Sequence, residues 1–296
     1  MKKSAVYILF PKTGLGNMLL VWANALVFAK KNQLPLVISG WWGFHWGAIV
    51  RREAKKRLYF GYFKETPLVT RVNYYLRSKI THCIYNPSPV AAVQPIKQPA
   101  LFVYNEVITH EHLFEVLEPH LGFIRQELYA LLTDGMRAQL DDFPVSGMSV
   151  HIRRGDFKIS NQATAISFFI KGINAARSAA GYSIPVTLFT DAEKEELAEV
   201  LSLGNILVAE KKADILDILL MSKSKILILS QSSTFSYWSA FLSEAFVILK
   251  HDDWQHRIRH DSGSYAEHRF NADDPAHEAM LVQNVSHRMQ ERKLVI

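Results

Sequence analysis

The amino-acid sequence predicts an α/β protein with parallel β-sheets, divided into two domains. Short apolar runs of strand length alternate with segments of helix length, most regularly after residue 146. The runs are almost entirely apolar, which is typical of parallel strands covered by helices on both faces. The 296 residues leave room for two domains of about 150 residues, and a domain of that size can build its own core.

The first domain is expected over residues 1–145. It begins with a strand, a loop that contains Gly14 and Gly16, and a helix, an order that places backbone N–H groups where a phosphate or substrate binds. The third glycine of a dinucleotide fingerprint and the Lys-Ser/Thr pair of a P-loop are both absent. The expected elements are strands at Ala5–Phe10, Leu34–Ser39 and Leu101–Glu106, and helices at Met18–Lys31, Glu111–Leu117 and Ile124–Leu132, with helical pieces between Arg51 and Lys79.

The second domain is expected over residues 146–251, after a boundary marked by residues 141–147 (Asp-Asp-Phe-Pro-Val-Ser-Gly). Strands and helices alternate there, which predicts a parallel sheet. Residues 252–296 are expected to form a polar tail that packs back on the domains. The expected strands are Met148–Arg153, Pro185–Thr190, Ile206–Ala209, Lys225–Ser230 and Ala245–Lys250, and the expected helices are Ala165–Ala179, Ala192–Leu203, Ile215–Ser222, Phe235–Glu244 and Pro275–Met289.

Composition indicates a globular chain, with 49% hydrophobic and 21% charged residues. The single cysteine, Cys83, cannot form an internal disulfide, so a cytoplasmic location is expected. The uncharged run between Lys12 and Lys30 contains glycine and asparagine, which suits a loop and a core helix better than a membrane span.

The positive charge is concentrated in the first half. Residues 1–145 hold 17 Lys+Arg against 10 Asp+Glu, a net charge of +7, whereas residues 146–296 hold 17 against 18, a net charge of −1. The cations cluster at residues 51–57 and at Arg71, Arg77 and Lys79. This basic segment, 51–79, predicts peripheral attraction to the inner face of a membrane or to an anionic glycan, and a solvated helix face is the alternative. Nucleic acid is not an expected partner, because no recognised nucleic-acid motif is present.

Four aromatic residues stand among glycines between residues 40 and 47. Such a group either packs in the core or stacks on a sugar ring or a base at the wall of a binding site. The residues are Trp41, Trp42, Phe44 and Trp46.

Polar residues follow three of the expected strands. Residues 151–157 (His-Ile-Arg-Arg-Gly-Asp-Phe) place two guanidinium groups at a strand end, where open α/β sheets bind ligands and where arginine can bond two oxygens of a phosphate. Asp191 ends another strand and either caps the following helix or accepts from a base or ribose. Residues 230–238 (Ser-Gln-Ser-Ser-Thr-Phe-Ser-Tyr-Trp) form a hydroxyl-rich loop that opens a helix, a typical phosphate site.

Together with residues 14–18 (Gly-Leu-Gly-Asn-Met) and 189–191 (Phe-Thr-Asp), these motifs resemble the α-1,2/α-1,6/protein-O-fucosyltransferase group. The resemblance is closest to the α-1,2-fucosyltransferases of glycosyltransferase family 11. It implies the GT-B type of fold, with two Rossmann-like domains facing across a cleft. It also implies metal-independent transfer of L-fucose from GDP-fucose, with inversion, to a hydroxyl of an acceptor glycan.

The resemblance assigns roles residue by residue. Arg153 would neutralise the β-phosphate of the departing GDP, and Arg154 would support the same group. Asn17 would point at the reacting sugar from the N-terminal domain. The nucleotide-binding residues would be His151 and Asp191 at the guanosine, Ser232, Ser233 and Thr234 at the diphosphate, and Gly14 and Gly16 in the glycine loop. The family usually has glutamine where this chain has Met18, so another sugar remains an alternative.

The chemistry of the residues agrees with this resemblance. A leaving diphosphate needs either a divalent metal or fixed cations, and the sequence contains no Asp-x-Asp, so no metal or other cofactor is expected. The inverting step needs a base for the acceptor hydroxyl, with Asp156 and Glu106 as candidates. The acceptor expected is an oligosaccharide or a lipid-linked glycan, with an α-1,2 linkage on a surface polysaccharide. The alternatives are a transferase for another nucleotide sugar and a non-catalytic glycan- or nucleotide-sugar-binding protein.

Overall fold

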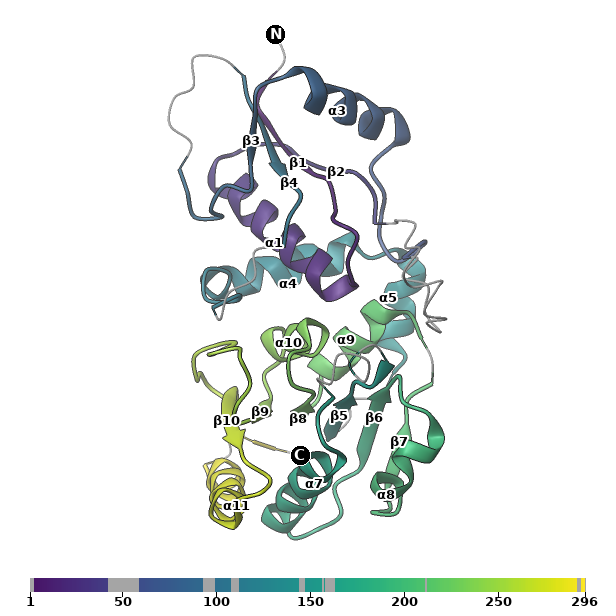
Figure 1. The fold of residues 1–296 in the computed structure, drawn as a ribbon, viewed down its shortest axis with the longest axis vertical. Coiled ribbons are helices and arrows are strands. Elements are labelled where there is room, and N and C mark those ends of the chain that lie inside the picture. Colours follow the sequence, from purple (N-terminus) through teal and green to yellow (C-terminus); the bar gives the residue numbers. More distant parts are fainter. Residues whose placement is uncertain are drawn as a thin grey trace. The chain divides into compact units, whose positions relative to one another are not determined.

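The computed structural model describes residues 3–41, 59–92, 99–107, 112–143, 147–155, 157, 163–210, 212–291 and 294–295. The chain forms two compact units, Met1–Ala138 and Gln139–Ile296 (Figure 1). Each contains a parallel sheet, which confirms the α/β prediction. The units divide inside helix α5 (Asp134–Asp141), slightly before the expected boundary.

Unit 1 contains a four-stranded sheet in the order β2-β1-β4-β3, with every pair parallel. Its two central strands, β1 and β4, are buried along their whole length, as their unbroken apolar sequences predict. Strand β3 begins at Cys83 and is half-buried at its first two residues, and the sequence reading missed it. The strands are β1 (Ala5–Ile8), β2 (Leu36–Ile38), β3 (Cys83–Tyr85) and β4 (Leu101–Tyr104).

Helix α1 (Leu15–Lys31) is the core helix of unit 1, and most of its side chains are buried. It begins at the carboxyl end of β1, so the glycine loop lies there too. The predicted helix at Glu111–Leu117 is wrong, because residues 112–117 form turns anchored by the buried side chains of Phe114 and Leu117. The other helices are α3 (Leu68–Ile80), the 3₁₀ helix η1 (Glu118–His120), α4 (Leu121–Leu131) and α5.

Only Trp41 of the predicted aromatic group lies within the described residues. It is fully buried, and its ring contacts those of Phe10, Trp22 and Phe63, with centroids 4.5, 6.4 and 4.1 Å away. For this residue, core packing is the correct alternative. Trp42, Phe44, Trp46 and the basic cluster at 51–57 lie outside the described residues.

Unit 2 contains a six-stranded parallel sheet in the order β10-β9-β8-β5-β6-β7. The five strands predicted from residue 148 onward are all present. A sixth, β10, pairs with β9 from Ala266 to Phe270, so residues 252–296 extend the sheet where a polar tail was expected. The strands are β5 (Met148–Ile152), β6 (Val186–Thr190), β7 (Ile206–Val208), β8 (Ile226–Leu229), β9 (Phe246–Lys250) and β10 (Ala266–Phe270).

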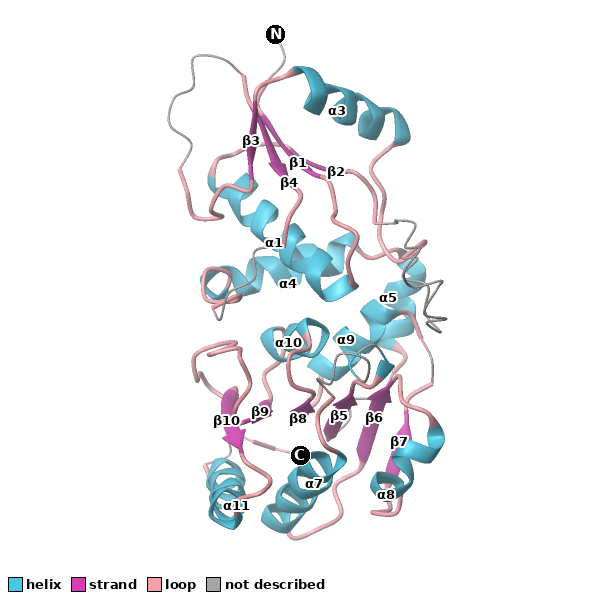
Figure 2. Ribbon diagram, viewed as in Figure 1, coloured by secondary structure: helices cyan, strands magenta, loops and turns pink. Residues whose placement is uncertain are grey.

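Helices cover both faces of the second sheet. One face packs against α7, α8 and α11, and α7 approaches so closely that a Cβ on Gly172 would lie 3.2 Å from a methyl group of Ile228. The other face packs against α10, which pairs with α9 (Figure 2). The helices are α7 (Ile166–Ala180), η2 (Lys194–Leu197), α8 (Ala198–Leu201), α9 (Asp214–Ser222), α10 (Thr234–Phe241) and α11 (Pro275–Gln290). Among the described residues, no helix is long and apolar enough to cross a membrane.

Candidate active site

The three motifs of the second domain meet at one edge of its sheet. Strand β5 lies between β8 and β6, and all three run in the same direction, so their carboxyl ends are adjacent. Arg153 and Arg154 follow β5, Asp191 follows β6, and the hydroxyl-rich loop follows β8. This edge is where parallel sheets bind ligands.

Asp191 holds the two arginines in place. Its Oδ2 forms an ion pair with Nη1 of Arg153 at 2.7 Å, and its Oδ1 accepts a hydrogen bond from the backbone N–H of Arg154 at 2.6 Å. A Cβ on Gly155 would lie 2.6 Å from Oδ2 of the same carboxylate, so any larger residue there would displace it. The Arg153 side chain keeps 30% of its surface exposed. The carboxylate therefore orients a cation that a ligand can still reach.

The alternative role for Asp191, as a helix cap, is wrong. The helix after β6 is capped by Glu193, which forms a capping box with Glu196. The predicted contact of Asp191 with a base or ribose stays a prediction.

Two hydroxyl groups fix the carboxyl end of β5 from both sides. Ser230 donates to the carbonyl of His151 and accepts from the N–H of Arg153, both at 2.8 Å. Thr190 donates to the carbonyl of Ile152 at 2.8 Å and accepts from the N–H of Ala192 at 2.9 Å. The sequence reading did not assign either hydroxyl this role, although the signal was present as a hydroxyl residue at the end of each neighbouring strand.

His151 lies on the sheet face that α10 covers. Its side chain is buried, its Nδ1 lies 2.5 Å from the hydroxyl of Ser236, and its ring stacks on Phe235 with centroids 5.2 Å apart. This histidine thus links β5 to the first turn of α10. Its predicted contact with guanosine stays a prediction.

The loop from Gln231 to Thr234 is held by bonds of its own. Ser232 adopts a left-handed backbone, with φ of 58°, and its N–H donates to the Tyr237 hydroxyl at 2.8 Å. Ser233 caps α10 by accepting from the N–H of Ser236 at 3.4 Å. Thr234 is the first residue of α10, and its side chain makes no hydrogen bond within the described residues. The Ser232 hydroxyl likewise makes no hydrogen bond within the described residues, and the Ser233 hydroxyl only accepts one, so all three predicted diphosphate ligands keep a donor for a ligand.

Asp253, which the sequence reading missed, supports this loop from beneath. It accepts a hydrogen bond from the Tyr237 hydroxyl and another from the N–H of Gln255 at 3.3 Å. Burial raises the pKa of the Asp253 carboxyl, and burial together with the Asp253 charge raises the pKa of Tyr237. Gln231 also bonds the loop to this segment, because its Nε2 donates a hydrogen bond to the carbonyl of Asp252 at 3.1 Å. No short motif marks Asp253, because its partner lies in a different element.

The remaining predicted residues lie in unit 1 or outside the described part of the chain. Gly14 is the N-cap of α1, and Gly16 is buried in its first turn. Asn17 donates from Nδ2 to the Thr13 hydroxyl at 2.9 Å, and its buried Oδ1 has no hydrogen-bond partner among the described residues. Glu106 is exposed just beyond β4, where its N–H donates to Asn86. Asp156 lies outside the described residues.

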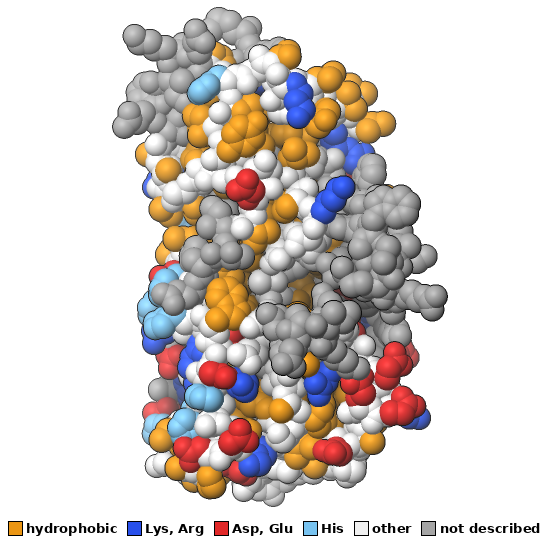
Figure 3. Space-filling view, in the orientation of Figure 1, with side chains coloured by type: hydrophobic (Ala, Val, Ile, Leu, Met, Phe, Trp, Pro, Cys, Tyr) orange, Lys and Arg blue, Asp and Glu red, His pale blue; other side chains and the backbone are white. Residues whose placement is uncertain are grey.

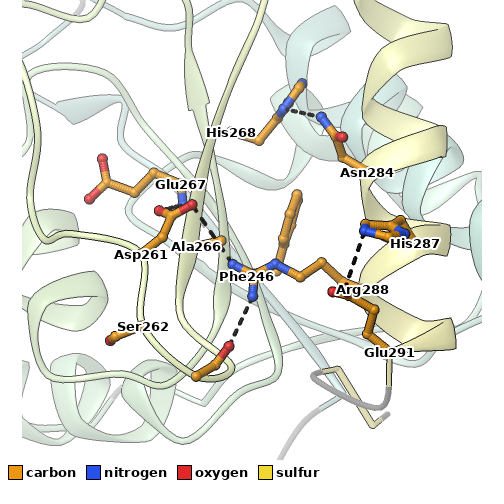
Figure 4. A pocket seen from close by; sticks show the side chains of 11 residues that line it. Phe246, Asp261, Ser262, Ala266, Glu267, His268, Asn284, His287, Arg288 and Glu291 are labelled. Atoms are coloured by element: carbon orange, nitrogen blue, oxygen red, sulfur yellow. Dashed lines mark hydrogen bonds and ion pairs between the residues drawn. The ribbon is translucent and has the colours of Figure 1, made fainter.

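A hollow of about 420 Å³ lies elsewhere in unit 2, near the amino ends of β9 and β10 (Figure 4). Arg288 lines it but donates to the carbonyls of Gly263 and Tyr265, at 2.9 and 3.0 Å. His268 also lines it, and burial lowers its pKa. Arg153 and Arg154 lie at the opposite, carboxyl end of the strands, so this hollow is separate from the candidate site.

Comparison with known proteins identifies the class. The family model for Glycosyl transferase family 11 matches residues 115–259, which include the arginine motif, Asp191 and the hydroxyl-rich loop. No curated protein matches the sequence. Among solved structures, POFUT1 in complex with GDP-fucose shares 11% identity over 81% of this chain and 94% of its own, with a TM-score of 0.52. The fucosyltransferase NodZ from Bradyrhizobium shares 16% identity over 82% of this chain and 94% of its own, with a TM-score of 0.48.

The fold and the family match define a glycosyltransferase enzyme with an α/β fold of the GT-B type, as predicted. The resemblance to family 11 is confirmed over residues 115–259, the stretch that carries the site.

Proposed function

We propose that this protein transfers L-fucose from GDP-fucose to a hydroxyl of an acceptor glycan. The observation that carries the proposal is the Arg153–Asp191 pair at the carboxyl end of β5, beside the first turn of α10. The donor is favoured because POFUT1, which shares the fold, is described in complex with GDP-fucose. An inverting reaction and an α-1,2 linkage on a surface polysaccharide follow from the resemblance to family 11.

Arg153 carries the chemical role. When the bond between fucose and GDP breaks, negative charge accumulates on the β-phosphate, and a cation already held in position stabilises that charge without reorganising. Asp191 supplies the positioning through its ion pair at 2.7 Å. Arginine suits this role because its planar donors match two phosphate oxygens at once.

The start of α10 provides the second part of the donor site. The amino end of a helix carries partial positive charge and unpaired N–H groups, both of which favour a diphosphate. The Ser233 cap and the Tyr237–Asp253 pair hold this helix start in one conformation. The hydroxyls of Ser232, Ser233 and Thr234 would then donate to the diphosphate.

Unit 1 would supply the groups for the sugar and the acceptor. The unpaired Oδ1 of Asn17 is buried at the start of α1, and a sugar hydroxyl is a suitable donor to it. Glu106 and Asp156 stay alternatives for the base. We also propose that the reaction needs no metal or cofactor, takes place in the cytoplasm and uses an oligosaccharide or lipid-linked acceptor.

The test is transfer and hydrolysis of a panel of nucleotide sugars, with and without excess EDTA. We expect GDP-fucose to be the preferred donor and activity to survive EDTA within a few-fold. A preference for another nucleotide sugar would favour the alternative that Met18 leaves open. Loss of activity in EDTA, restored by Mn²⁺ or Mg²⁺, would refute the role given to Arg153. Donor binding with neither transfer nor hydrolysis would indicate a non-catalytic binding protein.

A further inference from the structure

Helix α3 of unit 1 turns its apolar face toward solvent. On a helical wheel at 3.6 residues per turn, its apolar residues and Lys79 fall within an arc of about 140°. The apolar members are exposed by 46–76% of their surface, and Figure 3 shows hydrophobic side chains with Lys or Arg between them on this part of unit 1. They are Leu68, Val69, Val72, Tyr75, Leu76 and Ile80, and with Lys79 we name them the α3 face.

The opposite side of α3 packs its polar residues against the rest of unit 1. Arg77 is buried, donates to the carbonyl of Lys3, and lies over the ring of Tyr74 at 5.5 Å. The Tyr74 ring in turn lies 6.0 Å from that of Tyr7 in β1. Arg71 pairs with Glu65 at 2.8 Å. The helix is therefore inverted with respect to an ordinary surface helix, which buries its apolar side.

An inverted helix of this kind indicates a surface that is covered by a partner. Single exposed apolar residues are common, but a contiguous apolar face marks an interaction site with a protein or a membrane. At 13 residues α3 is too short to span a bilayer. It is long enough to lie in the plane of the interface, with its apolar side at the boundary between head groups and acyl chains.

Charge distinguishes between the two kinds of partner. The sequence has no Asp or Glu between Glu65 and Glu106, whereas α3 contains three cations, Arg71, Arg77 and Lys79. Lys79 is exposed on the α3 face, with its ammonium 5.2 Å from the Tyr75 ring. Aliphatic residues bordered by tyrosine and lysine are typical of helices at the surface of an anionic membrane. In a symmetric dimer the same face would meet itself and oppose cations with no carboxylate between them.

We propose that the α3 face docks unit 1 on an anionic lipid surface. This inference goes beyond the proposed chemistry and does not depend on it. It assigns the predicted membrane attraction to described residues, in which aliphatic side chains provide the main contact and Lys79 the charge. Such docking would bring the enzyme to a lipid-linked acceptor.

The test is sedimentation of the full-length chain with vesicles at low salt. One set contains phosphatidylcholine with phosphatidylglycerol, and the other contains phosphatidylcholine alone. We expect clear binding to the anionic vesicles and weaker binding to the neutral ones. The double variant Val72→Glu/Leu76→Glu should reduce anionic vesicle binding by at least about tenfold. Lys79→Glu should reduce it by about fivefold or more, because one basic residue is lost.

Leu207→Glu is the matched control. Leu207 is as exposed as Leu68, at 64%, but lies on β7 in unit 2, so its variant should bind vesicles like the unchanged protein. Donor hydrolysis and the melting temperature of each variant show that it is folded. If the double variant does not fold, the single variants Leu68→Glu and Lys79→Glu test the same face.

Three results would overturn the proposal. The unchanged protein could fail to bind anionic vesicles, folded α3 variants could bind as well as the control, or binding could be equal for neutral and anionic vesicles. A further outcome is that the unchanged protein does not bind vesicles but forms a dimer, and that the α3 variants are monomeric. This result would show that a second copy of the chain covers the α3 face.

Discussion

Two turns of this molecule, one in each unit, connect a buried strand to a helix and differ in the hydrogen bonds that hold them. In unit 1, β1 leads through Gly14 into α1, whose N-cap has no side-chain hydrogen bond. In unit 2, β8 leads through residues 230–233 into α10, and the hydroxyl or N–H groups of Ser230, Ser232 and Ser233 are all bonded within the unit. Serine groups hold the backbone of the unit 2 turn, whereas in the unit 1 turn Asn17 bonds Thr13 through Nδ2 and keeps a buried, unpaired Oδ1.

This difference separates two ways of making a binding site. A preorganised turn presents charge and donors without reorganising, which suits the stabilisation of a leaving group. A turn with an unsatisfied group gains a partner only when a ligand arrives, which suits recognition. Changes in the unit 2 turn should therefore alter structure and catalysis together, and changes in the unit 1 turn should alter catalysis alone.

The largest effect is expected from Arg153→Ala. Since its interaction strengthens as charge builds on GDP, kcat should fall by something on the order of 10²–10³ with a smaller change in the donor KM. Arg153→Lys should rescue little, because an ammonium cannot reproduce the two-point contact. Arg288→Ala, at the opposite end of the sheet, is the control and should leave kcat unchanged in the folded protein. A near-normal kcat in either Arg153 variant would show that the carboxyl end of β5 does not stabilise the leaving diphosphate.

Asp191→Asn should have the next largest effect. Sequence reasoning alone predicts that replacing Asp191 raises the donor KM and spares kcat. The structure changes this expectation, because the carboxylate orients Arg153 through an ion pair. We now expect kcat to fall by roughly tenfold or more, since misplaced catalytic groups lose rate. Gly155→Ala should reproduce the loss by displacing the same carboxylate. If steady-state kinetics show a raised donor KM with unchanged kcat, Asp191 binds the donor and does not act through Arg153.

Tyr237→Phe tests how much stability the unit 2 turn requires. The change leaves the N–H of Ser232 and the buried carboxylate of Asp253 without their shared partner. The free energy of unfolding should fall by about 1–3 kcal/mol, the cost of unsatisfied buried polar groups. Denaturant unfolding measures it. Tyr182→Phe is the control, since Tyr182 is 48% exposed, and it should unfold like the unchanged protein. Equal stabilities of the two variants would show that this bond does not hold the loop.

Asp253→Asn should have a smaller effect that depends on pH. Burial raises the pKa of Asp253 in the folded state, so ionising it there costs stability. This cost is absent below the unfolded pKa and grows as the pH rises through the folded pKa. Asparagine keeps an acceptor for Tyr237 and carries no charge. Unfolding measured from pH 4 to 8 should therefore show the variant gaining stability relative to the unchanged protein as the pH rises. A difference that is constant with pH would contradict the buried charge.

The sequence was sufficient for the parts of the fold whose signal is local. Apolar runs such as β5 and β8 are buried from end to end, so their composition predicts them. Strand β10 alternates buried and half-buried residues with charged side chains, and only its pairing with β9 makes it a strand. The wrongly predicted helix at Glu111–Leu117 shows that a local pattern can also mislead. Its apolar residues are spaced as in a helix, but residues 112–117 form turns.

The candidate site also contains residues that a local sequence pattern predicts and residues that it does not. Arg153, Asp191 and the serines lie in short motifs at strand ends, where parallel topology brings them together, and this much followed from the sequence. Asp253 supports Tyr237 from 16 positions along the chain, and no local pattern encodes such a contact. Whether Asp191 binds a ribose or an arginine likewise depended on side-chain geometry across two strands.

The smallest structural effect, and the clearest test of the comparison, is expected from Gly14→Ala. Gly14 has φ of −71°, which alanine adopts readily, and a Cβ there would meet nothing within 4 Å in the described structure. Stability should change by no more than roughly 0.5 kcal/mol, because alanine is a poorer N-cap than glycine but lowers the conformational entropy of the unfolded chain, and the two effects oppose each other. If a substrate approaches this turn closely, the added methyl group should still raise a substrate KM or lower kcat. Gly135→Ala is the control, because its Cβ is also unobstructed and it lies in a different helix, α5. A Gly14→Ala enzyme with unchanged kinetics would show that no substrate contacts the start of α1. Equal losses of stability and activity would show that the turn in unit 1 is as internally constrained as that in unit 2.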